Sequence, residues 1–154
     1  MKLEEKISLE EVFGKAYKIR LIEPENNKEA VITHFLNNNK KGVSKAYKND
    51  AIKFTKEILQ YKFPDENITN VLAEEALQYG IFETFDIPFP AVKNPKFKFI
   101  DLFAGVGGFR LAMQNLSGKC VYSSEWSLSS QNTYSRNFGE IPFGDINKDN
   151  IKIN

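Results

Sequence analysis

The residues best suited to chemistry are three glycines and two acids in the second half of the chain. Gly105, Gly107 and Gly108 lie close together, and glycine lets the backbone approach a ligand closely. A helix that begins at this turn would offer its free N–H groups and the positive end of its dipole to a carboxylate or a phosphate. Glu125 follows Gly105 by 20 residues, the spacing at which an acid reaches the hydroxyl groups of a ribose. Asp145 follows a further short apolar element and would accept a hydrogen bond from the amino group of adenine.

Two aromatic residues flank the same positions. Phe103 precedes the glycine turn and Trp126 follows Glu125, so the two rings would enclose a purine. The order Gly-x-Gly-Gly departs from the G-x-G-x-x-G pattern of dinucleotide-binding proteins, and an amino-acid carboxylate fits this turn as well as a pyrophosphate. The residues therefore favour S-adenosylmethionine over NAD as the ligand. The alternative interpretation of Glu125 and Asp145 is that they are solvated loop acids.

The elements that must position these residues form an α/β pattern. Residues 97–103 alternate and then run apolar, as a buried strand does. A glycine turn, a helix, a second strand and a second helix follow, and this is the order in which a nucleotide-binding α/β sheet opens. The expected bounds are 109–116 and 127–138 for the helices, 119–124 for the second strand and 141–143 for a short third element.

The first part of the chain is predicted to be mainly helical. Residues 8–11 (Ser-Leu-Glu-Glu) have the pattern of a capping box, and Thr69 is expected to begin a helix that Gly80 ends. Between them, Asn49 or Asp50 is expected to begin another helix. The expected buried faces are Ala51, Phe54, Ile58 and Tyr61 in the helix after residue 49, and Leu72, Ala76 and Tyr79 in the helix after Thr69.

Prolines separate the two parts. Three of them fall between residues 88 and 95, where they cannot lie inside a helix or a central strand. We therefore expect a helical region over residues 1–86, a linker over 87–96 and a truncated α/β domain over 97–154.

Lysine is concentrated in one segment of the helical region. Residues 40–62 contain seven lysines against two acids, with aromatic residues interleaved. Lys45, Lys48, Lys53 and Lys56 are the candidate contacts to DNA phosphates. The alternative is a solvated helix face whose aromatic residues point into a small core.

The α/β part resembles a known family. Residues 99–112 (FIDLFAGVGGFRLA) closely resemble the first motif of the DNA cytosine-5 methyltransferases, and residues 118–126 (GKCVYSSEW) resemble the second. Residues 132–134, 137–140 and 144–146 are similar to the stretch through the third motif, in the same order and spacing. The resemblance implies a Rossmann-like methyltransferase fold that binds S-adenosylmethionine.

The resemblance also implies a role for each residue of the site. Phe103 would pack on adenine, the three glycines would line the methionine part, and Glu125 would hold the ribose. Trp126 would contact the edge of the base, and Asp145 with Ile146 would recognise the adenine ring. The expected cofactor-binding residues are Phe103, Ala104, Gly105, Val106, Gly107, Gly108, Glu125, Trp126, Asp145 and Ile146.

The catalytic motifs of that family do not occur in these 154 residues. The family attacks cytosine with the Cys of a Pro-Cys loop, protonates the base with the Glu of Glu-Asn-Val, and steadies it with Gln-x-Arg-x-Arg. The one cysteine here, Cys120, follows Lys119 inside the second expected strand, so we expect a buried, unactivated thiol. We therefore expect no catalytic residue in this chain and no methylation by the chain alone.

Two hypotheses follow. In the first, the chain is the S-adenosylmethionine-binding N-terminal part or subunit of a DNA cytosine-5 methyltransferase of the restriction–modification type. A second chain or further residues would then supply the nucleophile and target recognition. In the alternative, it is a non-catalytic DNA- or protein-binding regulatory module with a vestigial methyltransferase segment. The expected partners are double-stranded DNA and either a complementary chain or a second copy, because so small a sheet leaves an unpaired edge.

Composition excludes other classes of protein. The 21 Lys+Arg and 20 Asp+Glu residues give a net charge of +1, which decides nothing about nucleic acid. One Cys excludes a disulfide framework and a cysteine-rich zinc site. His34 has no second ligand nearby and is expected to be a surface or packing residue, and Asp101 a structural acid at a strand end. No membrane span, signal peptide or metal site is expected, and the expected location is the cytoplasm.

Overall fold

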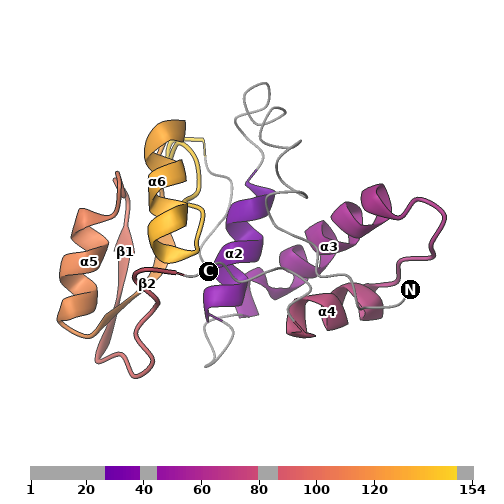
Figure 1. Cartoon of the computed structure of the whole chain (residues 1–154), viewed down its shortest axis with the longest axis horizontal. Coiled ribbons are helices and arrows are strands. Elements are labelled where there is room, and N and C mark those ends of the chain that lie inside the picture. The colour runs from indigo at the N-terminus through magenta and orange to yellow at the C-terminus, as the bar shows by residue number, and fades with distance from the viewer. Residues whose placement is uncertain (1–26, 39–44, 80–86, 149–154) are drawn as a thin grey trace.

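The computed structural model describes residues 27–38, 45–79 and 87–148 (Figure 1). The predicted capping box at residues 8–11 and the predicted helix end at Gly80 lie outside these residues. The described elements are α2 (Lys28–Asn38), α3 (Lys45–Lys62), α4 (Asn70–Tyr79), β1 (Phe97–Asp101), α5 (Gly108–Asn115), β2 (Gly118–Ser123) and α6 (Leu128–Phe138).

The two strands form a small parallel sheet, as the strand–helix–strand pattern predicts. Phe97 is opposite Gly118 at one end and Asp101 is opposite Ser123 at the other. The predicted third element adds a single parallel bridge between Ser124 and Phe143. The fold is therefore mixed α/β with helices around a parallel pair of strands, and the complete Rossmann-like sheet stays a prediction.

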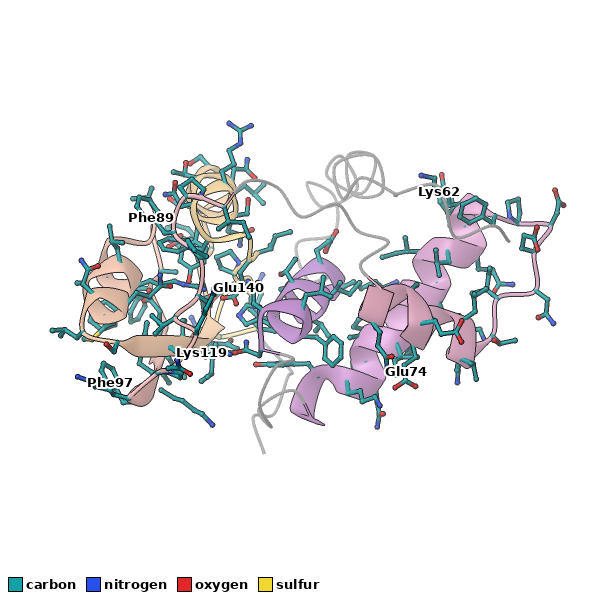
Figure 2. The ribbon with its side chains drawn as sticks, turned by 60° about the horizontal axis from the view of Figure 1, so that its bottom comes forward. Lys62, Glu74, Phe89, Phe97, Lys119 and Glu140 are labelled. Atoms are coloured by element: carbon teal, nitrogen blue, oxygen red, sulfur yellow. The ribbon has the colours of Figure 1, made fainter. Side chains whose placement is uncertain are left out.

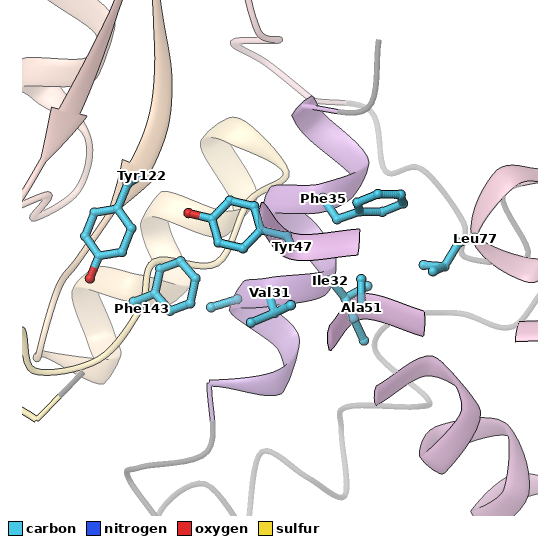
Figure 3. Close-up of a cluster of buried hydrophobic side chains, with 9 residues drawn as sticks. Val31, Ile32, Phe35, Tyr47, Ala51, Leu77, Tyr122 and Phe143 are labelled. Atoms are coloured by element: carbon cyan, nitrogen blue, oxygen red, sulfur yellow. The ribbon is translucent and has the colours of Figure 1, made fainter. Parts of the chain in front are cut away.

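One hydrophobic core joins the helical region to the sheet. Figure 3 shows the rings of Tyr122 and Phe143, from the α/β part, facing Tyr47 and the side chains of α2. The predicted division into a helical region, a linker over residues 87–96 and an α/β domain stays a prediction. The two regions on either side of that linker share buried side chains. The buried members of the core are Ala30, Val31, Ile32, Phe35, Tyr47, Ala51, Leu77, Tyr122 and Phe143.

Helix α3 differs from its prediction. It begins at Lys45, so Asn49 and Asp50 lie inside it and cap nothing. Its buried stripe is spaced by four residues, because α3 packs against both α2 and α4. Tyr61, expected on the buried face, is 78% exposed, and that prediction is wrong. The stripe consists of Tyr47, Ala51, Thr55 and Leu59.

The start of α4 agrees with its prediction. The N–H of Leu72 donates to the Oγ1 atom of Thr69 at 3.2 Å, the contact that a threonine cap makes. The helix begins at the next residue, Asn70. Thr69 is therefore confirmed as the residue that begins this helix.

Strand β1 is more exposed than the sequence predicts. Phe97 is 39% and Ile100 48% exposed, and only Asp101 of the strand is buried. The prediction of a buried strand is wrong here, because the burial of a strand's side chains depends on the elements that cover the faces of the sheet and not on the pattern of its own residues. Phe99 has a neighbour, since its ring meets that of Phe109 edge to face at 5.9 Å.

The proline-rich segment lies against α6. The N–H of Phe89 donates to the carbonyl oxygen of Asn137 at 3.0 Å, and its ring packs on that of Phe138 with centroids 5.8 Å apart. The N–H of Lys96 donates to the carbonyl of Ser117 at 2.8 Å, just before β1 begins. These contacts fix the path by which the chain enters the sheet.

No helix among the described ranges is both long enough and apolar enough to cross a membrane.

Candidate functional site

The turn after β1 requires glycine at two positions. Gly105 has a φ of 51° and Gly107 a φ of 97°, both in the left-handed region that disfavours other residues. The N–H of Gly107 donates to the carbonyl of Ala104 at 2.8 Å and closes the turn. A Cβ atom on Gly107 would also overlap the ring of Phe138 from α6. By contrast, no atom lies within 4 Å of the Cβ positions of Gly105 and Gly108, so the backbone is open there to a ligand.

Glu125 ties this turn to the end of β2. Its Oε2 atom accepts a hydrogen bond from the N–H of Gly105 at 2.8 Å, and its Oε1 atom accepts from the N–H of Ser127 at 2.7 Å. Gln131 from α6 donates to the carbonyl oxygen of Glu125. The side chain is thus oriented toward the glycine turn, and each carboxylate oxygen keeps a lone pair for a ligand hydroxyl.

The two predicted aromatic residues emerge at the same end of the sheet. Ala104 donates its N–H to the carbonyl of Ser124 at 2.9 Å, which holds the two strand ends side by side. Phe103 is 83% and Trp126 82% exposed, so both rings are available to a planar ligand. Val106 is also exposed, whereas the side chain of Ala104 is buried and leaves its backbone alone to face the site.

The segment with the second acid lies beside β2. Phe143 donates its N–H to Ser123 at 2.8 Å and accepts a hydrogen bond from the N–H of Glu125 at 2.8 Å. Asp145 therefore follows at the edge where Glu125 lies, as the order of the elements predicts. Its Oδ1 atom accepts hydrogen bonds from the backbone and side-chain nitrogens of Asn147, each at 3.0 Å. Ile146 is half-buried.

Behind the site lies a buried charged network that sequence reasoning missed. Arg110 of α5 donates to Glu140 Oε1 at 2.5 Å and to the hydroxyl oxygen of Tyr134 at 2.8 Å. Figure 2 shows Glu140 in the interior, between the α/β elements and α2. Burial raises the pKa of Glu140, but Arg110, His34 and the hydrogen bond from Asn37 together outweigh burial, so the pKa is lowered. The sequence signal was an arginine in a mostly apolar helix, with an acid just after the glycine that ends α6.

His34 connects this network to α2. Its Nδ1 atom donates to the carbonyl of Ala30 at 2.8 Å, and its Nε2 atom accepts from the N–H of Ser123 at 3.2 Å. The Nε2 atom also lies 3.4 Å from Oε1 of Glu140, inside the network. Phe143 packs on it with centroids 4.7 Å apart. The packing interpretation of His34 is confirmed, and the described ranges contain no cluster of three or more His, Cys, Asp or Glu residues suited to a metal.

Two further residues, Cys120 and Asp101, are buried. Cys120 is 2% exposed, and burial raises the pKa of its thiol to about 12, so the expected unactivated thiol is confirmed. Asp101 is buried at the end of β1, and burial raises the pKa of its carboxyl.

The candidate DNA-binding lysines do not all present a free charge. Lys48 is paired with Glu74 of α4, with Nζ and Oε1 2.5 Å apart. Lys53 is exposed and its ammonium lies 5.8 Å from the centre of the Phe54 ring. Lys56 is half-buried, and Lys45 begins the helix, but its side chain lies outside the described residues. DNA contact by this helix stays a prediction.

The glycine turn, the acid after the second strand and the second acid at the same edge define the class of site. Such groups at the carboxyl ends of parallel strands are typical of the nucleotide-binding sites of α/β domains. Comparison with known proteins shows which family this part of the chain is similar to: residues 97–154 match the family model of the C-5 cytosine-specific DNA methylases. The resemblance read from residues 99–146 is therefore confirmed. S-adenosylmethionine is the cofactor of this family.

Curated relatives extend the match. The type II methyltransferase M.HpaII of Haemophilus parainfluenzae is 54% identical over 83 residues, which cover 54% of this chain and 22% of the relative. M.HhaI of Haemophilus parahaemolyticus is 56% identical over 55 residues, covering 36% and 17%. M.MspI of a Moraxella species is 38% identical over 109 residues, covering 58% and 26%. The chain thus spans between 17% and 26% of the length of these relatives.

Proposed function

We propose that this chain is the S-adenosylmethionine-binding N-terminal part, or subunit, of a DNA cytosine-5 methyltransferase of the restriction–modification type. The observation that carries the proposal is the Glu125 carboxylate, which accepts from Gly105 at 2.8 Å and so joins the glycine turn to the end of the second strand. Bound there, S-adenosylmethionine supplies the methyl group that is transferred to cytosine.

The residues of the site fit this cofactor. Both carboxylate oxygens of Glu125 are oriented by backbone N–H groups and can accept from ribose hydroxyls. The open backbone at Gly105 and Gly108 admits the methionine part without a side chain in the way. Phe103 and Trp126, both more than four-fifths exposed, would cover the two faces of adenine, since stacked rings exclude water from its faces.

Asp145 completes the recognition of adenine. Its carboxylate would accept from the exocyclic amino group, while Ile146 packs against the ring. The proposed site is therefore the full set of ten residues predicted from the sequence: Phe103, Ala104, Gly105, Val106, Gly107, Gly108, Glu125, Trp126, Asp145 and Ile146.

We place the nucleophile and the target-recognition region outside these 154 residues. The sole cysteine, Cys120, is buried with a pKa raised to about 12, so it cannot act as a thiolate at neutral pH. The chain alone would bind the cofactor without methylating DNA, and a complementary chain or further residues would complete the enzyme. Its DNA substrate is double-stranded, and its proposed setting is the cytoplasm of a bacterium, as the relatives named above are bacterial.

The test uses the fluorescence of Trp126, the only tryptophan in the chain. Titration with S-adenosylmethionine or S-adenosylhomocysteine should change its emission in a saturable manner. Glu125→Gln should weaken binding roughly tenfold, because a charged acceptor for two hydroxyls becomes a neutral amide. The control is Glu75→Gln, which alters an exposed glutamate of α4. Trp126 emission that does not change at millimolar cofactor contradicts the proposal. Equal affinity of the two variants for the cofactor contradicts it as well.

A further inference from the structure

Helix α2 holds the segment that leads to Asp145. The Oγ1 atom of Thr33 accepts a hydrogen bond from the N–H of Ile141 at 3.0 Å. Asn27, just before the helix, accepts from the N–H of Gly144 through its Oδ1 atom at 3.0 Å. Side chains at both ends of a seven-residue stretch thus hold the backbone on either side of Phe143.

Asn37 adds a third contact, at the start of the same segment. Its Nδ2 atom lies 3.3 Å from the carbonyl oxygen of Gly139 and 3.3 Å from Oε2 of Glu140. Three polar side chains from the α2 region therefore reach residues 139–144, although more than a hundred positions separate them along the chain.

The end of the sheet supports the segment around Phe143 and Gly144 alone. The segment makes one isolated bridge, Ser124 with Phe143, instead of a continuous strand, and the Oγ atom of Ser124 donates to the carbonyl of Gly144 at 2.6 Å. The ring of Phe143 is fully buried, stacked on Tyr122 at 4.9 Å and packed on His34 of α2 at 4.7 Å. Backbone that is not paired in a ladder is fixed by side-chain hydrogen bonds and packing, and here the α2 region supplies a share of both, beside the end of β2.

We propose that α2 positions the adenine-recognition segment, with Thr33 and Asn27 as positioning residues. This inference rests on the proposed function, and it assigns the helical region a part in the cofactor site. Asp145 lies one residue after Gly144, so a displacement of the Gly144 backbone moves the carboxylate that meets the adenine amino group. The helical region thereby sets the affinity and the base selectivity for the adenosine part of the ligand.

Thr33→Val removes its acceptor at nearly constant volume, and Asn27→Ala removes the other by truncating the side-chain amide. Each leaves a backbone N–H without its partner, and the segment relaxes toward water. Asn27→Asp keeps an acceptor at the same place and is the conservative rescue. Thr69→Ala is the matched control, because it removes the cap hydrogen bond of α4 without touching residues 139–144.

The readout is the ratio of two dissociation constants, measured through Trp126 fluorescence on the full chain. The probes are S-adenosylhomocysteine and S-inosylhomocysteine, which carries a carbonyl oxygen where adenine has the amino group. The wild type should prefer the first. In T33V and N27A we expect that preference to fall about fivefold to tenfold, and in N27D and T69A to fall less than about twofold. An unchanged preference in T33V and N27A overturns the inference, since a merely structural loss lowers both affinities together.

Hydrogen exchange of the ligand-free chain separates this inference from the proposed function. In T33V and N27A the amides of residues 141–146 should exchange faster, while those of β1 and β2 keep wild-type rates. Faster exchange throughout the molecule, or no change at residues 141–146, overturns the positioning role. A wild-type chain that binds neither probe refutes the proposed function, and the exchange rates still decide whether α2 fixes the segment.

Discussion

Polar side chains near the carboxyl ends of β1 and β2 are stabilised in two different ways. On the side of the proposed cofactor site, Glu125 is held by backbone N–H groups and the neighbouring rings of Phe103 and Trp126 are exposed. On the inner side, Arg110 and Glu140 are fully buried and pair with each other. Polar groups of the first kind keep bonding capacity for a ligand, whereas those of the second kind satisfy one another and fix the fold.

Breaking the inner pair should have the largest effect. Arg110→Met leaves the carboxylate of Glu140 buried without its cation, and we expect a loss of about 3–5 kcal/mol in the free energy of unfolding. Urea unfolding followed by circular dichroism measures it. The double variant R110M/E140Q removes both charges and should recover a large part of the loss. A single variant that costs less than about 1 kcal/mol would show that the pair is not buried as described.

Alanine should have different effects on stability at Gly107 and at Gly108. Gly107→Ala places a Cβ in the left-handed region and against the ring of Phe138, so we expect a loss of about 2 kcal/mol or more. Gly108→Ala is the matched control, because Gly108 begins α5 and its Cβ would lie in open space. It should be neutral or stabilising by up to about 1 kcal/mol, since alanine favours the helix. Equal losses in thermal unfolding would contradict the packing of α6 on the turn.

Contacts within the strand–turn–helix–strand unit could be predicted from the sequence, whereas contacts between distant elements could not. The sequence predicted that the glycine turn and Glu125 meet at one end of the sheet, because the strand–turn–helix–strand order places both after neighbouring parallel strands. The contact of His34 with Ser123 joins residues 89 positions apart on elements that no local pattern relates. The exposure of Ile100 was missed for a similar reason, since burial depends on which elements cover a strand and not on its own alternation.

Acid should weaken the inner side selectively. The pKa of Glu140 is lowered in the folded chain, because Arg110, His34 and the hydrogen bond from Asn37 together outweigh the opposing effect of burial. A lowered pKa means that the pair stabilises the fold fully above the ordinary value of 4.5, and that this contribution is lost as the pH falls through the folded pKa. The melting temperature should therefore fall more steeply below pH 4.5 in the wild type than in the R110M/E140Q variant. Parallel pH profiles of the two proteins would refute this origin of the acid sensitivity.

The surface pair on the helical region should matter least for stability. Lys48 and Glu74 are both partly exposed, so water and salt weaken their attraction, and Lys48→Ala should cost less than about 1 kcal/mol. The measurement is urea unfolding at low and at moderate salt, with Glu74→Ala as the partner variant. A loss as large as that of the buried pair would mean that α3 and α4 depend on this contact, and would remove the contrast between surface and interior.

The lysines of α3 offer a second use of the same surface, which DNA retention at low salt tests directly. Replacing Lys45, Lys48, Lys53 and Lys56 with glutamate reverses four charges, and if α3 contacts phosphates the chain should lose its retention on duplex DNA. Lys48 contributes least in this interpretation, because Glu74 already neutralises it, so Lys53→Glu should weaken retention more than Lys48→Glu. Unchanged retention in the fourfold variant would leave these lysines as a solvated face. The role of the helical region would then be the one proposed for α2, which is to position the segment that leads to Asp145.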